Sequence, residues 1–589
     1  MKCKNLIRMF AAMAFVFVAV NTNAQEQADF ISPLNIPLQL SGNYGELRTN
    51  HFHSGVDIRV GGVVGQPVKA MADGYVNRVF VSPYGFGKAV YIAHPNGYTT
   101  VYCHLDRFNE TIGNYALTQQ YSRKSFNLDL YPAEGALKVK QGDIIGYAGN
   151  SGSSAGAHLH LDIRTTSNSV PVNVLARNFI KVTDNIAPVV VNIYRIEVDT
   201  LCGVPRHRVT ATYTTKATST NNYTINEVER VNIRRPSYFA IEVRGRKNDN
   251  SFNMGAYKVE QKVDSKLNFG FTIDNISYAN MRYSNATGYY PLARIKSNSV
   301  YALTRLPGNK LPIYHGLVND GILTCENGQT KNVSIDVIDD CGNKSTLSFD
   351  IYGYAYSEAE RAKQEQDNKA YLETNYGTLE PYVAKYNAAF SCEKEGVRVS
   401  IPAGVLYKSM LVNVQSSAKD DRSLAPYYTV GNTDEPLHKA ITISMDCSAL
   451  EHYGNKLRAA SVTSKGALAS AGGKINGSRL EFTTTSFGKF TIVADTTAPR
   501  ITPRWTNGAS LASSKSFAFT ISDDFSGVAT IKATIDGKWA MFDYDAKNSV
   551  ITHVFDSNRF EYNGTKHTVE VEVVDGCGNT KKYSGSFIR

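Results

Sequence analysis

The segment Ala157–Ile163 alternates polar and apolar residues, which is typical of a β-strand. Successive side chains of a strand point to opposite faces, so His158 and His160 would share one face while the leucines next to them occupy the other. Two imidazoles on one face can act together, one binding a metal and the other catalysing. The pair alone is equally compatible with a structural role, so its meaning depends on the rest of the chain.

The N-terminus has the layout of a secretory signal peptide. Basic residues within Lys2–Arg8 precede an apolar run, Met9–Val20, and small residues end at Ala24. The run is short for a membrane span, so a signal peptide is favoured over a membrane anchor. We therefore predict cleavage after residues 1–24, no membrane span afterwards, and a protein exported to the periplasm or cell envelope, or secreted.

Charge gives little information about partners. The chain has 63 basic and 53 acidic residues, and three of the basic ones lie in the predicted signal peptide. The remaining surplus is compatible with an anionic cell-wall partner without identifying one. No nucleic-acid-binding motif occurs, and we expect no nucleic-acid partner.

The eight cysteines are widely spaced and form no Cys-x-x-Cys motif. A thiolate zinc site is therefore not expected. An oxidising compartment would permit disulfides such as Cys325–Cys341 or Cys392–Cys447, but the sequence does not determine the pairing.

Short Val-, Ile- and Tyr-rich runs between glycine-rich turns predict a mainly β chain. At 589 residues it is long enough for roughly three to five domains. We divide it into a first β region (25–182), a β-sandwich-like second region (183–355), a helical spacer (356–386), a β-rich third region (387–494) and an immunoglobulin-like β-sandwich fourth region (495–589).

The spacer contains the one helix that the sequence predicts, Ser357–Thr374. Its start, Ser357–Glu360, resembles a capping box, and Ala, Glu, Lys and Gln dominate the residues that follow. The segment is polar nearly all round, which favours a spacer over a core helix.

The second and fourth regions carry the same pair of motifs. Each opens with Asp-x-x-Ala-Pro, at Asp184 and Asp495, and each closes with Asp-x-Cys-Gly-Asn, at Asp339–Asn343 and Asp575–Asn579. The shared motifs suggest two copies of one β-sandwich module. For the closing motif, a hairpin turn is favoured over a calcium or other metal loop.

Nothing in regions two to four resembles a catalytic site. Asp523–Gly527 and Trp539 are interpreted as a turn and a core residue in preference to a carbohydrate platform. These regions are expected to serve in placing, spacing or binding a protein partner.

Six of the twelve histidines lie in the first region, at positions 51, 53, 94, 104, 158 and 160. His53 and Asp57 are four residues apart, and His160 could join them as a third ligand. Two imidazoles and one carboxylate make an open zinc site with water in the fourth position. Zinc lowers the pKa of that water towards about 7 and polarises a scissile carbonyl.

Proton transfer and oxyanion stabilisation need further groups. His158 and His104, which ends a predicted strand, could supply them. His51 could share the face of His53. His51 and His94 are each expected either to contact the metal ligands without binding the metal or to lie at the surface.

In this order, the motifs resemble the lysostaphin/LytM-type zinc endopeptidases, which cut peptide cross-links in bacterial peptidoglycan. The resemblance covers residues 32–175. The matching segments are His53–Asp57, Pro67–Gly74, Gly87–His94, Tyr102–Leu105, Val139–Gly146 and Gly149–Ser153 followed by His158–His160. No His-Glu-x-x-His motif occurs, so a thermolysin-like site is excluded.

The resemblance implies an antiparallel β metallopeptidase domain with one Zn²⁺ per chain in a groove. It implies that His53, Asp57 and His160 bind the zinc and that His104 and His158 assist catalysis. It also implies cleavage of peptidoglycan peptides and not of sugars.

Two features depart from the family pattern. Leu161-Asp162 replaces the frequent Phe-Glu pair, which leaves open whether Asp162 supports the ligands. The stretch Asp106–Lys138 is longer than compact members need, and it forms either a wall or lid of the groove or a surface insertion.

We therefore predict an exported zinc metalloendopeptidase that hydrolyses peptidoglycan. Two alternatives remain: a non-catalytic wall-binding regulator of another hydrolase, and a surface adhesive protein built around its β-sandwich modules. The sequence does not identify the peptide bond that is cleaved.

Overall fold

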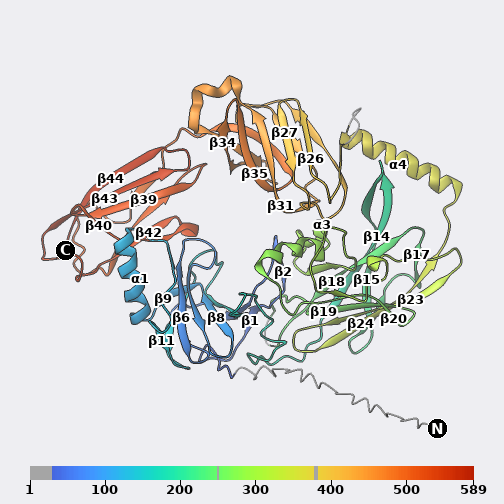
Figure 1. Ribbon diagram of the computed structural model, residues 1–589, viewed down its shortest axis with the longest axis horizontal. Helices are drawn as coiled ribbons and strands as arrows, with labels where there is room; N and C mark the ends of the chain where they lie inside the picture. Colours follow the sequence, from blue (N-terminus) through green and yellow to red (C-terminus); the bar gives the residue numbers. More distant parts are fainter. Residues whose placement is uncertain (1–28, 249–250, 377–381) are drawn as a thin grey trace, which may run out of the picture.

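The computed structural model describes residues 29–248, 251–376 and 382–589. The predicted signal peptide, residues 1–24, lies outside the described residues. The chain is mainly β, as predicted from the sequence. Its regions follow one another around a ring, so that the fourth region returns to the first (Figure 1). None of the helices in the described part is both long and apolar enough to cross a membrane.

The first region is built on an eight-stranded antiparallel sheet. In spatial order the strands are β1 (Leu40–Gly42), β4 (Val56–Arg59), β13 (His158–Thr165), β8 (Tyr98–Cys103), β7 (Lys88–Ala93), β6 (Gly74–Val81) and β10 (Leu128–Leu130), and β11 (Lys138–Val139) also pairs with β6. A smaller sheet contains β5 (Pro67–Lys69), β12 (Ile144–Ala148) and β9 (Leu105–Phe108).

Strand β13 lies between β4 and β8, and its alternating sequence explains this central position. Leu159, Leu161 and Ile163 are fully buried in the core of the first region. Burying each such side chain contributes about 1.5–3 kcal/mol. Because the leucines take the core side, the histidines between them face the opposite side of the sheet.

The stretch Asp106–Lys138 contains a helix, α1 (Glu110–Arg123), and a strand, β10, which the sequence analysis did not predict. Helix α1 begins after Asn109, whose side chain accepts a hydrogen bond from the backbone N–H of Ile112. The helix is rich in Asn, Gln and Tyr and buries only Ile112, Ala116 and Gln120. It therefore lacks the apolar stripe by which an amphipathic helix is recognised.

The second region contains one eleven-stranded sheet. Strands from both halves of this sheet contribute side chains to one hydrophobic core. In order the strands are β21 (Ser299–Ala302), β18 (Ser237–Arg244), β14 (Val189–Leu201), β15 (Val204–Ser219), β16 (Asn222–Ile225), β24 (Lys344–Gly353), β23 (Thr330–Ile338), β19 (Lys258–Val263), β20 (Lys266–Thr272) and β22 (Tyr314–His315), with β17 (Arg230–Ile233) also pairing with β24. The hairpin of β2 (Leu47–Arg48) and β3 (His51–Phe52) lies beside it, and Phe52 belongs to its core.

The predicted spacer helix is present as α4 (Glu358–Tyr376). Ser357 and Glu360 form the predicted capping box: the Ser357 N–H donates to the Glu360 carboxylate at 2.9 Å, and the Glu360 N–H donates to Ser357 Oγ at 3.3 Å. Within α4 only Tyr376 is buried, as expected for a helix that is polar nearly all round.

The third region consists mainly of two five-stranded sheets around one core. One contains β26 (Phe390–Lys394), β27 (Val397–Ile401), β31 (Pro436–Asp446), β35 (Arg479–Ser486) and β34 (Lys474–Asn476). The other contains β29 (Val414–Ser417), β30 (Tyr427–Val430), β36 (Gly488–Ala494), β32 (Leu457–Val462) and β33 (Leu468–Gly472). A short pair, β25 (Tyr382–Ala384) and β28 (Met410–Val412), packs on the same core, so the end of the predicted spacer belongs with the third region.

The fourth region is a smaller sandwich of two four-stranded sheets. One contains β37 (Arg500–Pro503), β38 (Ser516–Ser522), β42 (Val550–Val554) and β41 (Asp543–Asp545). The other contains β40 (Lys538–Trp539), β39 (Val528–Ile535), β43 (Lys566–Asp575) and β44 (Thr580–Ile588).

The seven cysteines of the described residues are free thiols. The two disulfides that the sequence would permit, Cys325–Cys341 and Cys392–Cys447, are therefore not formed. Each of the four β regions is stabilised by its own hydrophobic core and not by these disulfides.

Candidate active site

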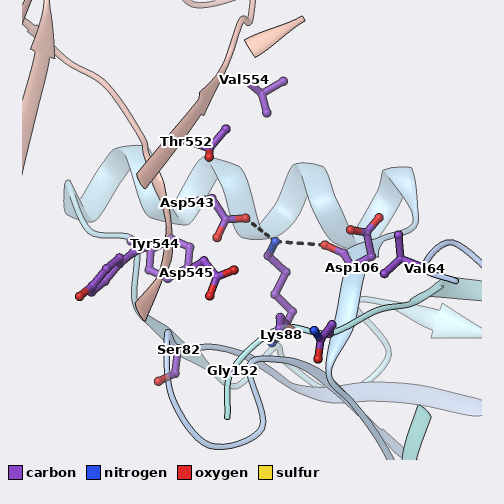
Figure 2. A pocket seen from close by; sticks show the side chains of 13 residues that line it. Val64, Ser82, Lys88, Asp106, Gly152, Asp543, Tyr544, Asp545, Thr552 and Val554 are labelled. Carbon is purple, nitrogen blue, oxygen red and sulfur yellow. Dashed lines mark hydrogen bonds and ion pairs between the residues drawn. The ribbon is translucent and has the colours of Figure 1, made fainter. Parts of the chain in front are cut away.

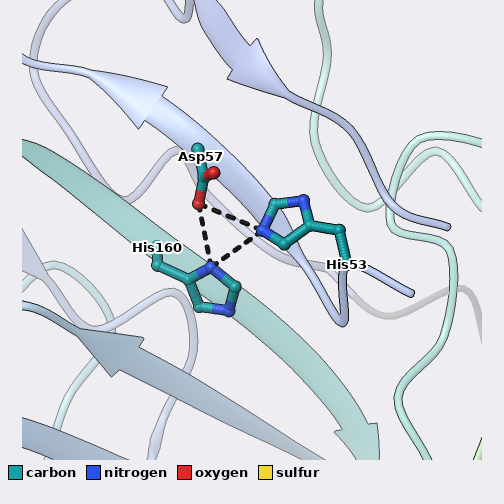
Figure 3. Close-up of side chains that lie close together, drawn as sticks. All are labelled: His53, Asp57 and His160. Atoms are coloured by element: carbon teal, nitrogen blue, oxygen red, sulfur yellow. Dashed lines mark hydrogen bonds and ion pairs between the residues drawn. The ribbon is translucent and has the colours of Figure 1, made fainter. Parts of the chain in front are cut away.

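Strand pairing brings together three of the predicted site residues. In the register of β4 and β13, Asp57 lies opposite His160, and His53 precedes β4. His53 Nε2 lies 3.0 Å from His160 Nδ1 and 3.1 Å from Asp57 Oδ1, and His160 Nδ1 lies 2.9 Å from the same oxygen (Figure 3). All three side chains are buried.

The outer hydrogen bonds of the two rings show what kind of ligand fits between them. His53 Nδ1 donates to the carbonyl of Asn43 at 2.9 Å, and His160 Nε2 donates to Oδ1 of Asp162 at 2.7 Å. When both rings are neutral, His53 Nε2 and His160 Nδ1, which face each other, therefore each carry a lone pair. With Asp57 Oδ1, three electron-pair donors converge, which is the donor set of an open zinc site.

The electrostatics of the three side chains agree with a cation site. Burial lowers the pKa of His53 to about 4. Burial acts in the same direction on His160, but the carboxylates of Asp162 and Asp57 outweigh it and raise the pKa of His160 to about 9. A metal ion in this position would therefore replace a proton on His160.

The other two predicted catalytic residues lie beside this group. The ring centroid of His104 is 4.9 Å from that of His158 and 5.9 Å from that of His160. His158 Nε2 lies 3.3 Å from Asp57 Oδ1. His104 and His158 thus border the three converging donors.

His104 is held in a defined orientation as a neutral ring. It follows β8 with a φ of 59°, and its Nδ1 donates to the carbonyl of Ser151 at 2.9 Å, which leaves Nε2 as the lone-pair nitrogen. Burial and the neighbouring His160 and His158 lower the pKa of His104 to about 3. The ring is therefore neutral at neutral pH, with the lone pair on Nε2.

The remaining histidines of the first region do not join the group. His51 is exposed, and its Nδ1 is hydrogen-bonded to the carbonyl of Thr49. His94 is buried between the carbonyl of Asp73 and the hydroxyl of Thr100.

Several residues at the site were missed by the sequence analysis. Arg48 Nη2 lies 2.6 Å from Asp57 Oδ2. Asp162, besides holding His160, accepts hydrogen bonds from Arg164 Nε at 3.0 Å and from the Tyr278 hydroxyl at 2.6 Å. Arg164 could have been found from its place on the same strand face. Tyr278 belongs to the second region, and no local pattern connects it to the site.

The first region is similar to known proteins. Residues 51–119 match the model of peptidase family M23. A 155-residue stretch is 33% identical to the DD-carboxypeptidase/endopeptidase Mpg of Neisseria meningitidis and covers 25% of this chain and 29% of that protein. The first region, called the M23 domain below, is of the lysostaphin/LytM type, family M23.

Other relatives also match this M23 domain. The glycyl-glycine endopeptidase ALE-1 of Staphylococcus capitis is 30% identical over 132 residues, covering 22% of this chain and 27% of that protein. The catalytic domain of lysostaphin from Staphylococcus simulans is 25% identical, with a TM-score of 0.17, covering 22% of this chain and 81% of that one. This chain therefore spans less than a third of the length of Mpg and of ALE-1, the two curated relatives named here.

Outside the M23 domain, residues 381–495 match the model of a Zu5-like domain. This match coincides with the third region. It adds no residue to the candidate active site.

Residues of the second region hold Asn43, the residue whose carbonyl orients His53. The side chain of Asn43, whose carbonyl holds His53, donates to Asp340 Oδ2 at 2.9 Å and to the carbonyl of Gly255 at 3.0 Å. Asn43 is fully buried. The orientation of His53 therefore depends on contacts with residues about 200–300 positions further along the chain.

The fourth region contacts the M23 domain near His104. Lys547 Nζ donates to the carbonyls of Asn150 and Gly152, on either side of the Ser151 carbonyl that holds His104. Lys88 pairs with Asp543 across a cavity of about 340 Å³ between the two regions (Figure 2).

Helix α1 makes a second contact between the same regions. The rings of Tyr121 and Trp539 meet edge to face at 5.0 Å, and Arg559 lies over Tyr121. The stretch Asp106–Lys138 thus forms part of a contact with the fourth region.

Proposed function

We propose that this chain is an exported zinc endopeptidase that hydrolyses peptide cross-links or stems of bacterial peptidoglycan. The observation that carries the proposal is the convergence of His53 Nε2, His160 Nδ1 and Asp57 Oδ1, where a metal ion would replace a proton on His160. The names of the relatives, DD-carboxypeptidase/endopeptidase and glycyl-glycine endopeptidase, support the substrate class. The signal-peptide pattern supports a periplasmic or cell-envelope location.

His53, Asp57 and His160 would hold one zinc ion. When bound, zinc supplies a water of lowered pKa and polarises the scissile carbonyl. His104, neutral and with Nε2 free, is oriented by Ser151 to accept a proton at that nitrogen. His158, the most exposed of the four histidines at this site, donates from Nδ1 to the carbonyl of Gly156 at 2.9 Å, so its Nε2 would donate to a developing oxyanion only when the ring carries a second proton.

Incubation of the purified full chain with peptidoglycan tests the proposal. New amino termini are identified by mass spectrometry, with and without a chelator, which also names the bond. We expect chelation, His160→Ala and Asp57→Ala each to abolish cleavage, and readdition of zinc to restore it only in the wild type. His452→Ala, an exposed histidine of the third region, is the matched control and should cleave normally.

Cleavage that persists after complete loss of zinc, verified by elemental analysis, would refute the mechanism. Saturable binding to peptidoglycan without new amino termini would instead identify a non-catalytic wall-binding regulator.

A further inference from the structure

The closing motif Asp-x-Cys-Gly-Asn forms the same turn in the second and fourth regions. The carboxylate of Asp339, like that of Asp575, accepts hydrogen bonds from the backbone N–H groups two and four residues further along the chain. The residue after the aspartate is Asp340 in one motif and Gly576 in the other. Because the turn forms with glycine at this position, it does not require the carboxylate of Asp340.

One oxygen of Asp340 is engaged within the second region. Its Oδ1 accepts a hydrogen bond from the ammonium of Lys247, and the two side chains are 0% and 1% exposed. Lys247 Nζ also lies 2.8 Å from Asp184 Oδ2. A buried carboxylate is costly unless it is paired, so Lys247 allows Asp340 to remain ionised in the interior. The other oxygen, Oδ2, is left for a second partner.

The second partner of Asp340 belongs to the first region. Its Oδ2 accepts a hydrogen bond from Asn43 Nδ2 at 2.9 Å. The same amide exchanges two further hydrogen bonds with Gly255: Nδ2 donates to the carbonyl at 3.0 Å, and Oδ1 accepts from the N–H at 2.7 Å. Both donors and the acceptor of this fully buried amide are thus used by the second region. The second region therefore fixes the position of Asn43.

Asn43 in turn orients His53. Its backbone carbonyl accepts the hydrogen bond from His53 Nδ1 at 2.9 Å. The neighbouring Tyr44 is also held by the second region, because its hydroxyl accepts from the N–H of Ile276 at 2.8 Å. The direction of the Asn43 carbonyl decides where the opposite nitrogen of the ring, Nε2, points. A continuous series of hydrogen bonds thus runs from Lys247 to the candidate metal site.

Only a carboxylate satisfies both neighbours of position 340. Lys247 and Asn43 both donate, and the two oxygens of Asp340 each accept one bond. An amide at this position has a single acceptor, so it would turn its NH₂ group towards one of the two donors. A buried donor left without an acceptor costs about 1–3 kcal/mol. The charge of Asp340 is therefore needed for the contact with Asn43 and not only for the ion pair.

We infer that Asp340 is a positioning residue for His53, acting through Asn43, so that the second region sets the zinc affinity of the M23 domain. A metal-binding histidine is oriented by the partner of its other ring nitrogen, and changes in such partners cost about 10–100-fold in metal affinity. The inference rests on the proposed function, because it takes His53 as a zinc ligand. It also gives a role to the residue that distinguishes the second closing motif from the fourth-region copy.

Zinc affinity of the full chain tests this role without relying on activity. Competition with a chromophoric chelator measures it, below the melting transition of each variant. Asp340→Asn places two amides opposite each other, and Asn43→Asp places two carboxylates opposite each other. We expect each change to weaken zinc binding about tenfold or more. The double variant Asn43→Asp/Asp340→Asn restores an amide facing a carboxylate, so it should bind zinc more tightly than either single variant.

Asp274→Asn is the matched control. It removes an ion pair of 2.7 Å with Arg177, which joins the same two regions through other residues, and it should bind zinc as the wild type does. A wild type that binds no zinc would contradict the proposed function itself. With zinc bound by the wild type, unchanged affinity in Asp340→Asn, an equal loss in Asp274→Asn, or no recovery in the double variant would overturn the role of Asp340 alone.

Discussion

His160 donates a 2.7 Å hydrogen bond from Nε2 to Oδ1 of Asp162, two residues further along the same strand. Asp162 is fully buried, and it remains ionised because Arg164, His160 and Tyr278 outweigh the effect of burial and lower its pKa. The bond selects the tautomer in which His160 Nδ1 faces Asp57 and His53. A carboxylate behind the ring thus decides which nitrogen can bind a metal.

Replacing Asp162 tests this relationship. We expect Asp162→Asn to weaken zinc binding about 10–100-fold, because the amide no longer fixes the tautomer or raises the basicity of His160. Competition with a chromophoric chelator measures the affinity. Asp129→Asn, an exposed carboxylate of the same domain, is the control. Tyr278→Phe removes only one hydrogen bond to Asp162 and should cause a smaller loss; zinc affinity unchanged in both variants would contradict the relationship.

His104 should affect catalysis without affecting metal content. Because its ring lies outside the three converging donors, we expect His104→Gln to bind zinc normally and to lower kcat about 10²–10⁴-fold. Steady-state kinetics on a cross-linked peptide and zinc analysis of the same sample make the comparison. Loss of zinc from His104→Gln would instead make His104 a ligand.

Lys547 should influence the M23 domain from the fourth region. Its ammonium holds the two carbonyls that flank Ser151, so Lys547→Met should loosen the support of His104. We expect kcat to fall several-fold, with KM and zinc content nearly unchanged. Lys582→Met, an exposed lysine of the same region, provides the control. Equal kcat in the two variants would show that this contact has no effect on catalysis.

His438 should make stability depend on pH at the joint between the second and third regions. It is buried, stacks on Tyr283 at 4.1 Å, and burial with Lys439 and Arg282 lowers its pKa to about 4. The unfolded chain, with a pKa near 6.5, binds more protons between pH 6.5 and 4, so stability is lost as the pH falls through this range.

We expect His438 to contribute up to about 2 kcal/mol of this loss between pH 7 and pH 5. Denaturant unfolding at several pH values should show a weaker pH dependence for His438→Gln than for the wild type. Exposed His452, changed to Gln, should leave the dependence as it is. A His438→Gln curve parallel to that of the wild type would assign the effect to other groups.

Local patterns in the sequence were sufficient for the mainly β class and for the candidate site. Alternation over His158–Ile163 placed two histidines on one strand face, and the capping box at Ser357 marked the start of α4. Such features depend on neighbours within a few residues, so a single chain displays them. Helix α1 escaped prediction because its sequence has almost no apolar periodicity.

Only the tertiary structure decided what surrounds the candidate site. Register between β4 and β13 set Asp57 opposite His160, while Tyr278 and Lys547 reach the M23 domain from segments more than 100 and nearly 400 residues away. Contacts over such separations follow from how whole sheets pack and leave no periodic signal in the chain. The sequence by itself therefore determined which side chains could bind a metal, and the packing of the other regions decided how firmly they are held.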